Sequence, residues 1–85
     1  MKYFVYILQS AISGKLYIGQ TRDLGSRLEK NNNGYNKSTK NDRPWEVIFS
    51  IEFGTRAQAM ALERKLKALK KRDSVFRYVR QNNGM

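Results

Sequence analysis

Glu63 is one of two acidic residues in the most basic part of this sequence. Between Arg56 and Arg80 there are nine basic residues and two acidic ones. A single carboxylate can hold Mg²⁺ or Mn²⁺ when water and a phosphate complete the shell, because Mg²⁺ gives up its water reluctantly. Such an ion stabilises the leaving oxygen in phosphodiester hydrolysis. Glu63 is therefore a candidate metal ligand; the alternative is a surface ion pair with Lys67, four residues on.

Arg27 is a candidate phosphate ligand. A guanidinium group offers two parallel hydrogen bonds to a phosphate and stays charged at every relevant pH. Arg27 lies between Leu24 and Leu28, which recur four residues apart. On a helix it would therefore lie close to the apolar face. The alternative is an arginine whose aliphatic stem covers the edge of the core.

Two tyrosines, Tyr6 and Tyr17, each lie in a short run rich in aromatic and β-branched residues. Packing within a sheet is the ordinary role of such a tyrosine. The two rings can share one face of a hairpin only if the strand register allows it, and the sequence leaves that register open.

Composition limits the possible chemistry. The 85 residues include no Cys and no His, which excludes a disulfide framework, a zinc finger and a Ser/His/Asp triad. We expect a single domain over residues 1–85, with a core at 1–80 and a frayed tail at 81–85. The apolar run at residues 3–8 is too short for a signal peptide or a membrane span, so we expect a cytoplasmic protein.

A formal net charge of +10 points to a polyanionic partner. Neutralising phosphates releases condensed counterions and draws a basic surface onto DNA or RNA. A membrane is a poorer candidate, because the basic stretch lacks bulky aromatic anchors. We expect phosphate contacts without sequence readout from these residues: Arg22, Lys65, Lys67, Lys70 and Lys71. For stacking, Tyr35 and Trp45 lie near a polar segment, although Trp45 is better suited to packing on the sheet edge.

Periodicity predicts the first elements. Residues 3–8 and 16–18 favour a β-hairpin, and Thr21 or Asp23 can cap the short helix that carries Leu24 and Leu28. The segment 31–44 is rich in Asn, Lys, Ser and Gly, which favours an exposed loop.

The second half predicts a strand and two helices. From Trp45 to Phe53 alternate residues are apolar, and we expect one apolar face made of Val47, Phe49, Ile51 and Phe53. A capping box at 55–58 opens the longest helix, with a core stripe of Ala59, Leu62, Leu66 and Leu69. A last helix begins near Asp73 and buries Val75, Phe76 and Val79. The fold class is α+β, a ββαβα order with a terminal helix and a three-stranded antiparallel sheet flanked by helices.

This order of motifs resembles the GIY-YIG nuclease domain. The half-motifs are Val5-Tyr6-Ile7 and Tyr17-Ile18-Gly19, followed by Arg27 and by Glu63 in an alanine-rich helix. The resemblance implies a DNA endonuclease in which Tyr17 is the general base and Tyr6 orders the attacking water. It also implies that Arg27 binds the phosphate and that Glu63 holds a single Mg²⁺ or Mn²⁺. Flexible, nicked or branched DNA, in repair or recombination, is the expected substrate.

Two departures from the family pattern keep alternatives open. Asn31 stands where the family has a His that assists proton transfer, and Val75 occupies a region where many members have Asn. Loss of a general acid or base costs about two to four orders of magnitude in rate. The second hypothesis is therefore a nucleic-acid-binding module of the same fold without catalysis. A third is a basic, ribosome-associated protein that prefers RNA.

Overall fold

Three antiparallel strands form one sheet in the order β2-β1-β3. The computed structural model describes residues 2–34 and 40–82. Its strands are β1 (Tyr3–Ser10), β2 (Leu16–Thr21) and β3 (Trp45–Phe53), and its helices are α1 (Leu24–Asn32), the 3₁₀ turn η1 (Lys40–Asp42), α2 (Arg56–Ala68) and α3 (Arg72–Asn82). The predicted α+β class and element order are confirmed.

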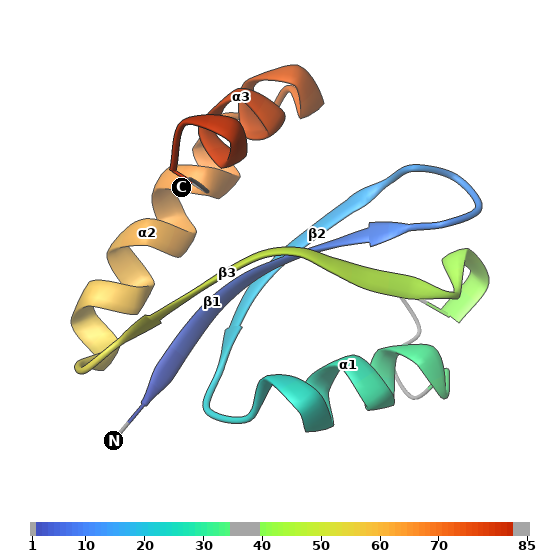
Figure 1. Ribbon diagram of the computed structural model, residues 1–85, viewed down its shortest axis with the longest axis horizontal. Coiled ribbons are helices and arrows are strands. Elements are labelled where there is room, and N and C mark those ends of the chain that lie inside the picture. The colour runs from blue at the N-terminus through green and yellow to red at the C-terminus, as the bar shows by residue number, and fades with distance from the viewer. Residues whose placement is uncertain (1, 35–39, 83–85) are drawn as a thin grey trace.

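Helices cover both faces of the sheet, α2 and α3 on one side and α1 on the other (Figure 1). The central strand β1 is buried on both faces, which is why Val5 to Leu8 form an unbroken apolar run. On the α2 side the buried core consists of Val5, Ile7, Phe49, Ala59, Leu66, Val75 and Val79. On the α1 side it consists of Tyr6, Leu8 and Trp45, with Leu24 and Leu28 packed against them. Tyr6 and Tyr17 belong to the α1-side cluster and Arg27 to α1, whereas Glu63 comes from α2 on the other side of the sheet.

The predicted apolar face of β3 is wrong at Val47. An irregularity in the pairing opposite Ile7 and Leu8 aligns Ile7 with Phe49 and Leu8 with Val47. One extra residue in β3 reverses the alternation, because neighbouring strand residues point to opposite faces. Val47 therefore packs with the α1-side cluster, whereas Phe49 belongs to the core beneath α2.

The exposed loop predicted at 31–44 is wrong at its first residues, whereas Lys40, Asn41, Arg43 and Pro44 are exposed as expected and residues 35–39 lie outside the described residues. Asn31 and Asn32 belong to α1, and Asn31 is 1% exposed. Asn32 clamps the start of β3: its Nδ2 donates to the Trp45 carbonyl at 3.1 Å, and its Oδ1 accepts from the Trp45 amide at 2.6 Å. Trp45 itself is 5% exposed, so it packs as expected and offers no stacking surface. The other stacking candidate, Tyr35, lies outside the described residues.

Side-chain caps begin the helices. Asp23, not Thr21, caps α1, with its Oδ1 accepting from the Ser26 amide at 3.0 Å. Thr55 caps α2 through the Gln58 amide, as the capping box predicts. α3 continues through Gln81 and Asn82 into the expected tail, because the Asn82 side chain donates to the Tyr78 carbonyl at 2.9 Å. Within the described ranges, no helix has the length and apolar character that crossing a bilayer requires.

Candidate active site

Tyr6 and Tyr17 share the α1 face of the sheet. Tyr6 pairs with Gly19. Leu8, two residues after Tyr6, pairs with Tyr17, two residues before Gly19. Paired residues and their i±2 neighbours point to the same side of a sheet. The two rings accordingly stack, with centroids 6.4 Å apart and planes inclined by 24°. The sequence does not determine the hairpin register, and the register in the structure places both tyrosines on the same face.

Gly19 gives the Tyr6 ring room to cross the neighbouring strand. A Cβ at this position would lie 2.6 Å from the Tyr6 Oη and 2.9 Å from its Cζ. Both separations are below any ordinary van der Waals contact. The glycine that ends the second half-motif is thus needed for its small size, since its backbone is ordinary extended strand.

The Tyr6 hydroxyl is the one candidate group with a strongly shifted pKa among the described residues. Tyr6 is 2% exposed. Its pKa is raised to about 12, first by burial, then by proximity to Tyr17 and, more weakly, to Glu63, while the Arg27 charge lowers it. All three other candidates therefore lie within electrostatic range of this hydroxyl. Tyr6 is protonated at neutral pH and can donate a hydrogen bond, but it cannot act as a base there.

The raised pKa of Tyr6 predicts a loss of stability at high pH. Between an unfolded value near 10 and a folded value of about 12, the folded chain holds the extra proton. This stability is fully present below pH 10 and is lost as pH rises toward 12, by about 2–3 kcal/mol in total. Urea unfolding at several pH values should show that loss reduced in Tyr6→Phe. Equal pH dependence in both proteins would contradict the buried position of the hydroxyl.

Glu63 lies where α2 packs against β2. Its Oε1 accepts a hydrogen bond from Gln20 Nε2 at 2.9 Å, and its Oε2 lies 3.0 Å from Lys67 Nζ. The ion pair with Lys67 that the sequence offered as an alternative therefore exists. The side chain of Glu63 is 19% exposed, so the carboxylate remains accessible from solvent.

A metal ion bound at this position would have one carboxylate ligand from the described residues. Among the described residues there is no group of three or more acidic, His or Cys side chains that could hold a metal ion. Glu63 fits a hydrated Mg²⁺ or Mn²⁺ that keeps most of its water, and it does not fit a closed site such as that of structural zinc. Lys67 occupies the Oε2 side of the carboxylate, so an ion there competes with this ammonium group.

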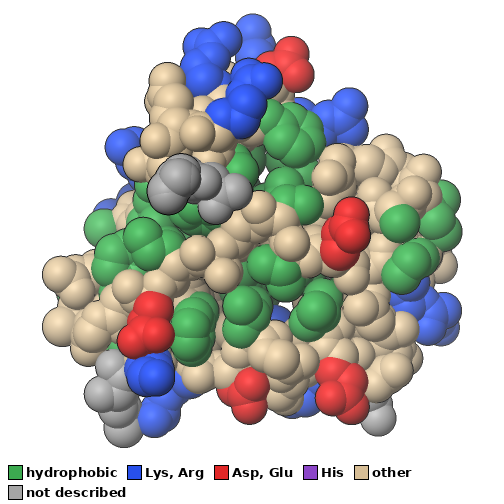
Figure 2. Space-filling model, in the orientation of Figure 1, with side chains coloured by type: hydrophobic (Ala, Val, Ile, Leu, Met, Phe, Trp, Pro, Cys, Tyr) green, Lys and Arg blue, Asp and Glu red, His purple; other side chains and the backbone are tan. Residues whose placement is uncertain are grey.

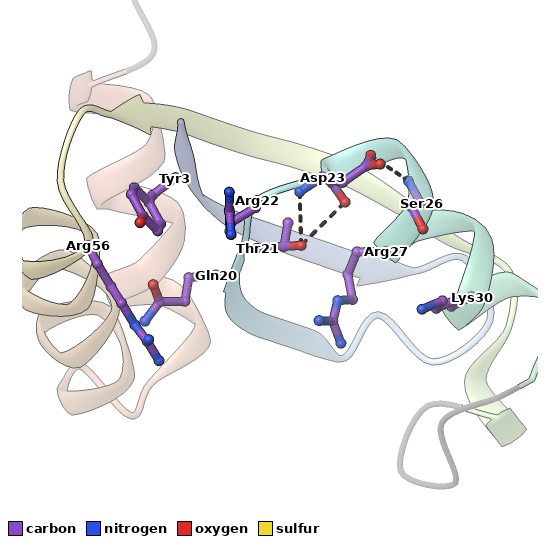
Figure 3. Close-up of a pocket in the computed structure, with 9 residues that line it drawn as sticks. All are labelled: Tyr3, Gln20, Thr21, Arg22, Asp23, Ser26, Arg27, Lys30 and Arg56. Carbon is purple, nitrogen blue, oxygen red and sulfur yellow. Dashed lines mark hydrogen bonds between the residues drawn. The ribbon is translucent and has the colours of Figure 1, made fainter. Parts of the chain in front are cut away.

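Arg27 lines a groove of about 500 Å³ whose lining includes Tyr3 and the acidic Asp23 but neither Tyr6 nor Tyr17. Arg27 and Lys30 point toward it from α1, and Arg56 reaches past Gln20 from the start of α2 (Figure 3). Arg22, one of the predicted phosphate contacts, also lines the groove. Lys30 and Arg56 were missed, because nothing in their local sequence separates them from ordinary solvated charges. The four cations make this groove suitable for phosphate groups.

The other basic candidates separate in space. Lys65 lies over the Tyr78 ring, 5.6 Å from its centroid, and so faces α3 instead of the site. Lys67 and Lys70 line a second hollow, whereas Lys71 lines none of the hollows described here. On the face shown in Figure 2, the Lys and Arg side chains that are drawn gather near α3 and at the margins. The described side chains form no continuous basic stripe across the middle of that face.

Comparisons with known proteins agree with this geometry. A family model described as the GIY-YIG catalytic domain matches residues 2–78. A UPF0213 protein of Staphylococcus epidermidis is 37% identical over 67 residues, covering 78% of this chain and 80% of that protein. A UPF0213 protein of Staphylococcus saprophyticus is 34% identical over 67 residues, with the same shares of the two chains. The solution structure of a UPF0213 protein from Bacillus halodurans superposes with a TM-score of 0.63 at 29% identity, over 99% of this chain and 88% of that one.

Proposed function

This chain belongs to the GIY-YIG family of nuclease domains, and on that basis we propose that it is a divalent-metal-dependent DNA endonuclease. One observation carries the proposal. Tyr17, Arg27 and Glu63 come from three different elements; the Tyr17 ring stacks on Tyr6, and Arg27 and Glu63 lie close enough to influence the pKa of the Tyr6 hydroxyl. A base, a phosphate ligand and a carboxylate are the groups that hydrolysis of a phosphodiester requires.

Each residue has a distinct role in this proposal. The phenolate form of Tyr17 takes a proton from the attacking water and becomes the phenol, while the hydroxide attacks phosphorus; Tyr6, which stays protonated, positions that water by donating a hydrogen bond. Arg27 binds the non-bridging phosphate oxygens. Glu63 would hold Mg²⁺ or Mn²⁺, and such an ion would supply the positive charge that stabilises the leaving oxygen. Asn31 has no basic group that could accept a proton, and its side chain is buried away from solvent. It therefore does not replace the family's His.

The groove in Figure 3 supports a substrate held mainly by its backbone. Its cations Arg22, Arg27, Lys30 and Arg56 suit phosphate oxygens and do not read base edges across a wide surface. We propose low sequence specificity and a preference for nicked or branched DNA, where distortion costs less energy. Repair or recombination is the proposed setting.

The test is cleavage of labelled linear, nicked, forked and four-way DNAs. We expect cleavage with Mg²⁺ or Mn²⁺, none with a chelator, and the highest rate on a distorted substrate, because Glu63 is the ligand of the required ion. Identically purified Glu63→Gln protein controls for contaminating nuclease. Cleavage that persists in the chelator, or in the variant, would count against the proposal.

The engagement of Glu63 by Lys67 and Gln20 specifically favours a second candidate function. A chain in which Lys67 permanently occupies the carboxylate would bind nucleic acid without cutting it. Salt-sensitive DNA binding by both wild type and Glu63→Gln, with cleavage by neither, would establish this binding module instead. Stronger binding to RNA than to DNA of the same sequence would favour a ribosome-associated role.

A further inference from the structure

A second hollow, of about 450 Å³, lies on the other side of Glu63 from the phosphate groove. It is formed where β2 meets the end of α2 and the start of α3. Eight described residues line it: Leu16, Tyr17, Ile18, Leu66, Lys67, Lys70, Arg72 and Val75. The proposed endonuclease mechanism uses only Tyr17 of this set.

The lining has an apolar part and a cationic part. Leu16 and Ile18 are half-buried and supply its accessible apolar surface, whereas Leu66 and Val75 are buried core residues behind it. Lys67, Lys70 and Arg72 form the cationic rim, and none of the eight lining residues is acidic. An apolar surface with a few fixed charges is typical of a small-ligand site of this volume. The complementary ligand has a flat apolar part attached to a negative charge.

Arg72 is held at the rim. Its Nη1 donates to the Gly14 carbonyl in the β1–β2 turn at 3.0 Å. A guanidinium anchored through one nitrogen keeps its other N–H groups for a ligand, and less side-chain entropy is lost when an anion binds. The rim therefore includes one pre-positioned cation and two flexible ones.

Lys70 takes an unfavourable backbone conformation at this rim. Its φ is +59°, and it follows Leu69, the C-cap of α2. Glycine is the usual residue at such a position, because a Cβ in the left-handed region is strained. A lysine here costs stability that a glycine would not cost, and strain of this kind is typical of functional positions.

The hollow adjoins the proposed reaction centre. Tyr17, the proposed base, lines it directly, and Lys67 connects it to Glu63 through the 3.0 Å ion pair. On the other side, Gln20 lines the phosphate groove and donates to Glu63 at 2.9 Å. Glu63 therefore contacts one residue of the phosphate groove and one residue of this hollow.

We propose that this hollow binds one unpaired nucleotide of the DNA substrate, next to the phosphate that is cut. The base lies against Leu16 and Ile18, and its phosphate contacts Lys67, Lys70 and Arg72. The inference rests on the proposed endonuclease function and names its substrate class. A base that is stacked and paired within a duplex cannot reach Leu16 and Ile18, so the substrate is DNA with an unpaired nucleotide at the cleavage site.

The first experiment removes single bases from the substrate. A forked DNA is bound in chelator, so that nothing is cut, and each unpaired nucleotide near the junction is replaced in turn by an abasic unit. We expect one position at which the abasic unit weakens binding about 5- to 100-fold, the range for loss of one base contact. Equal affinity at every position would overturn the inference.

The second experiment uses the strained lysine. Lys70→Gly is expected to raise Tm by about 4 °C, while it reduces the salt slope of DNA binding by about 1 because one phosphate contact is lost. Arg77→Ala removes the same charge from the exposed surface of α3, outside the hollow, and should leave the slope unchanged. An unchanged slope in Lys70→Gly, or a lower Tm, would overturn the inference.

The two proposals can fail separately. If the wild-type protein binds and cuts forked DNA but no abasic unit weakens binding, only the proposed nucleotide site is contradicted. Wild-type protein that does not bind any of the DNAs would remove the endonuclease proposal itself.

Discussion

Glu63→Gln is expected to lower metal-dependent DNA cleavage by about 10²–10³-fold, the usual cost of removing one group that stabilises transition-state charge. The substitution preserves the shape of the side chain and an oxygen for the hydrogen bond from Gln20 Nε2. It removes the negative charge, on which divalent-ion binding depends. Single-turnover cleavage at saturating protein, with Mg²⁺ varied, measures the effect directly.

Glu52→Gln is the matched control for this prediction. Glu52 is an exposed acid on β3, the opposite edge strand from β2, and its replacement changes the net charge by the same amount. Both variants should bind DNA equally well in chelator, and only Glu63→Gln should lose cleavage. Both should also unfold at nearly the wild-type temperature. Lys67 is largely exposed, so its ion pair with Glu63 contributes about 1 kcal/mol or less to the free energy of unfolding. Equal loss in the two variants would mean that charge in general, and not the Glu63 site, limits the reaction.

Gly19→Ala is expected to destabilise the fold by about 1–3 kcal/mol, the range for forcing an extra carbon into a well-packed core. The new methyl group would overlap the Tyr6 Oη, 2.6 Å away, and must displace the Tyr6 ring. Because the Tyr6 ring stacks on Tyr17, the proposed base, cleavage should fall even at temperatures where the variant is folded. Chemical denaturation and cleavage assays on the same preparation separate the two effects.

Two further variants check this explanation. In Gly25→Ala, the new carbon would have its nearest contact at 3.8 Å, from Asp23 Oδ1, so this helical glycine should tolerate the change or gain stability. Tyr6→Phe removes the closest atom, and Gly19→Ala combined with Tyr6→Phe should recover part of the lost stability. If Gly19→Ala is as stable as Gly25→Ala, the tyrosine does not cross the strand at Gly19.

Much of the secondary structure follows from local sequence. The core stripe Ala59, Leu62, Leu66 and Leu69 and the caps at Asp23 and Thr55 were predicted and are present. These signals involve residues within one or two turns of each other, where 3.6-residue periodicity and side-chain capping act without help from the rest of the chain. The residue types at the candidate site were likewise visible in the sequence, since their chemistry does not depend on the fold.

Only the tertiary structure decided how these residues meet. The extra residue in β3 that turns Val47 away from Phe49, the burial of Asn31, and the entry of Arg56 into the groove of Arg27 all depend on contacts between distant segments. The pairing of Tyr6 with Gly19 is of the same kind, because a shift by one residue would send the two tyrosines to opposite faces. Local propensity does not determine strand register. The register is set by the packing of β1 between two helical layers.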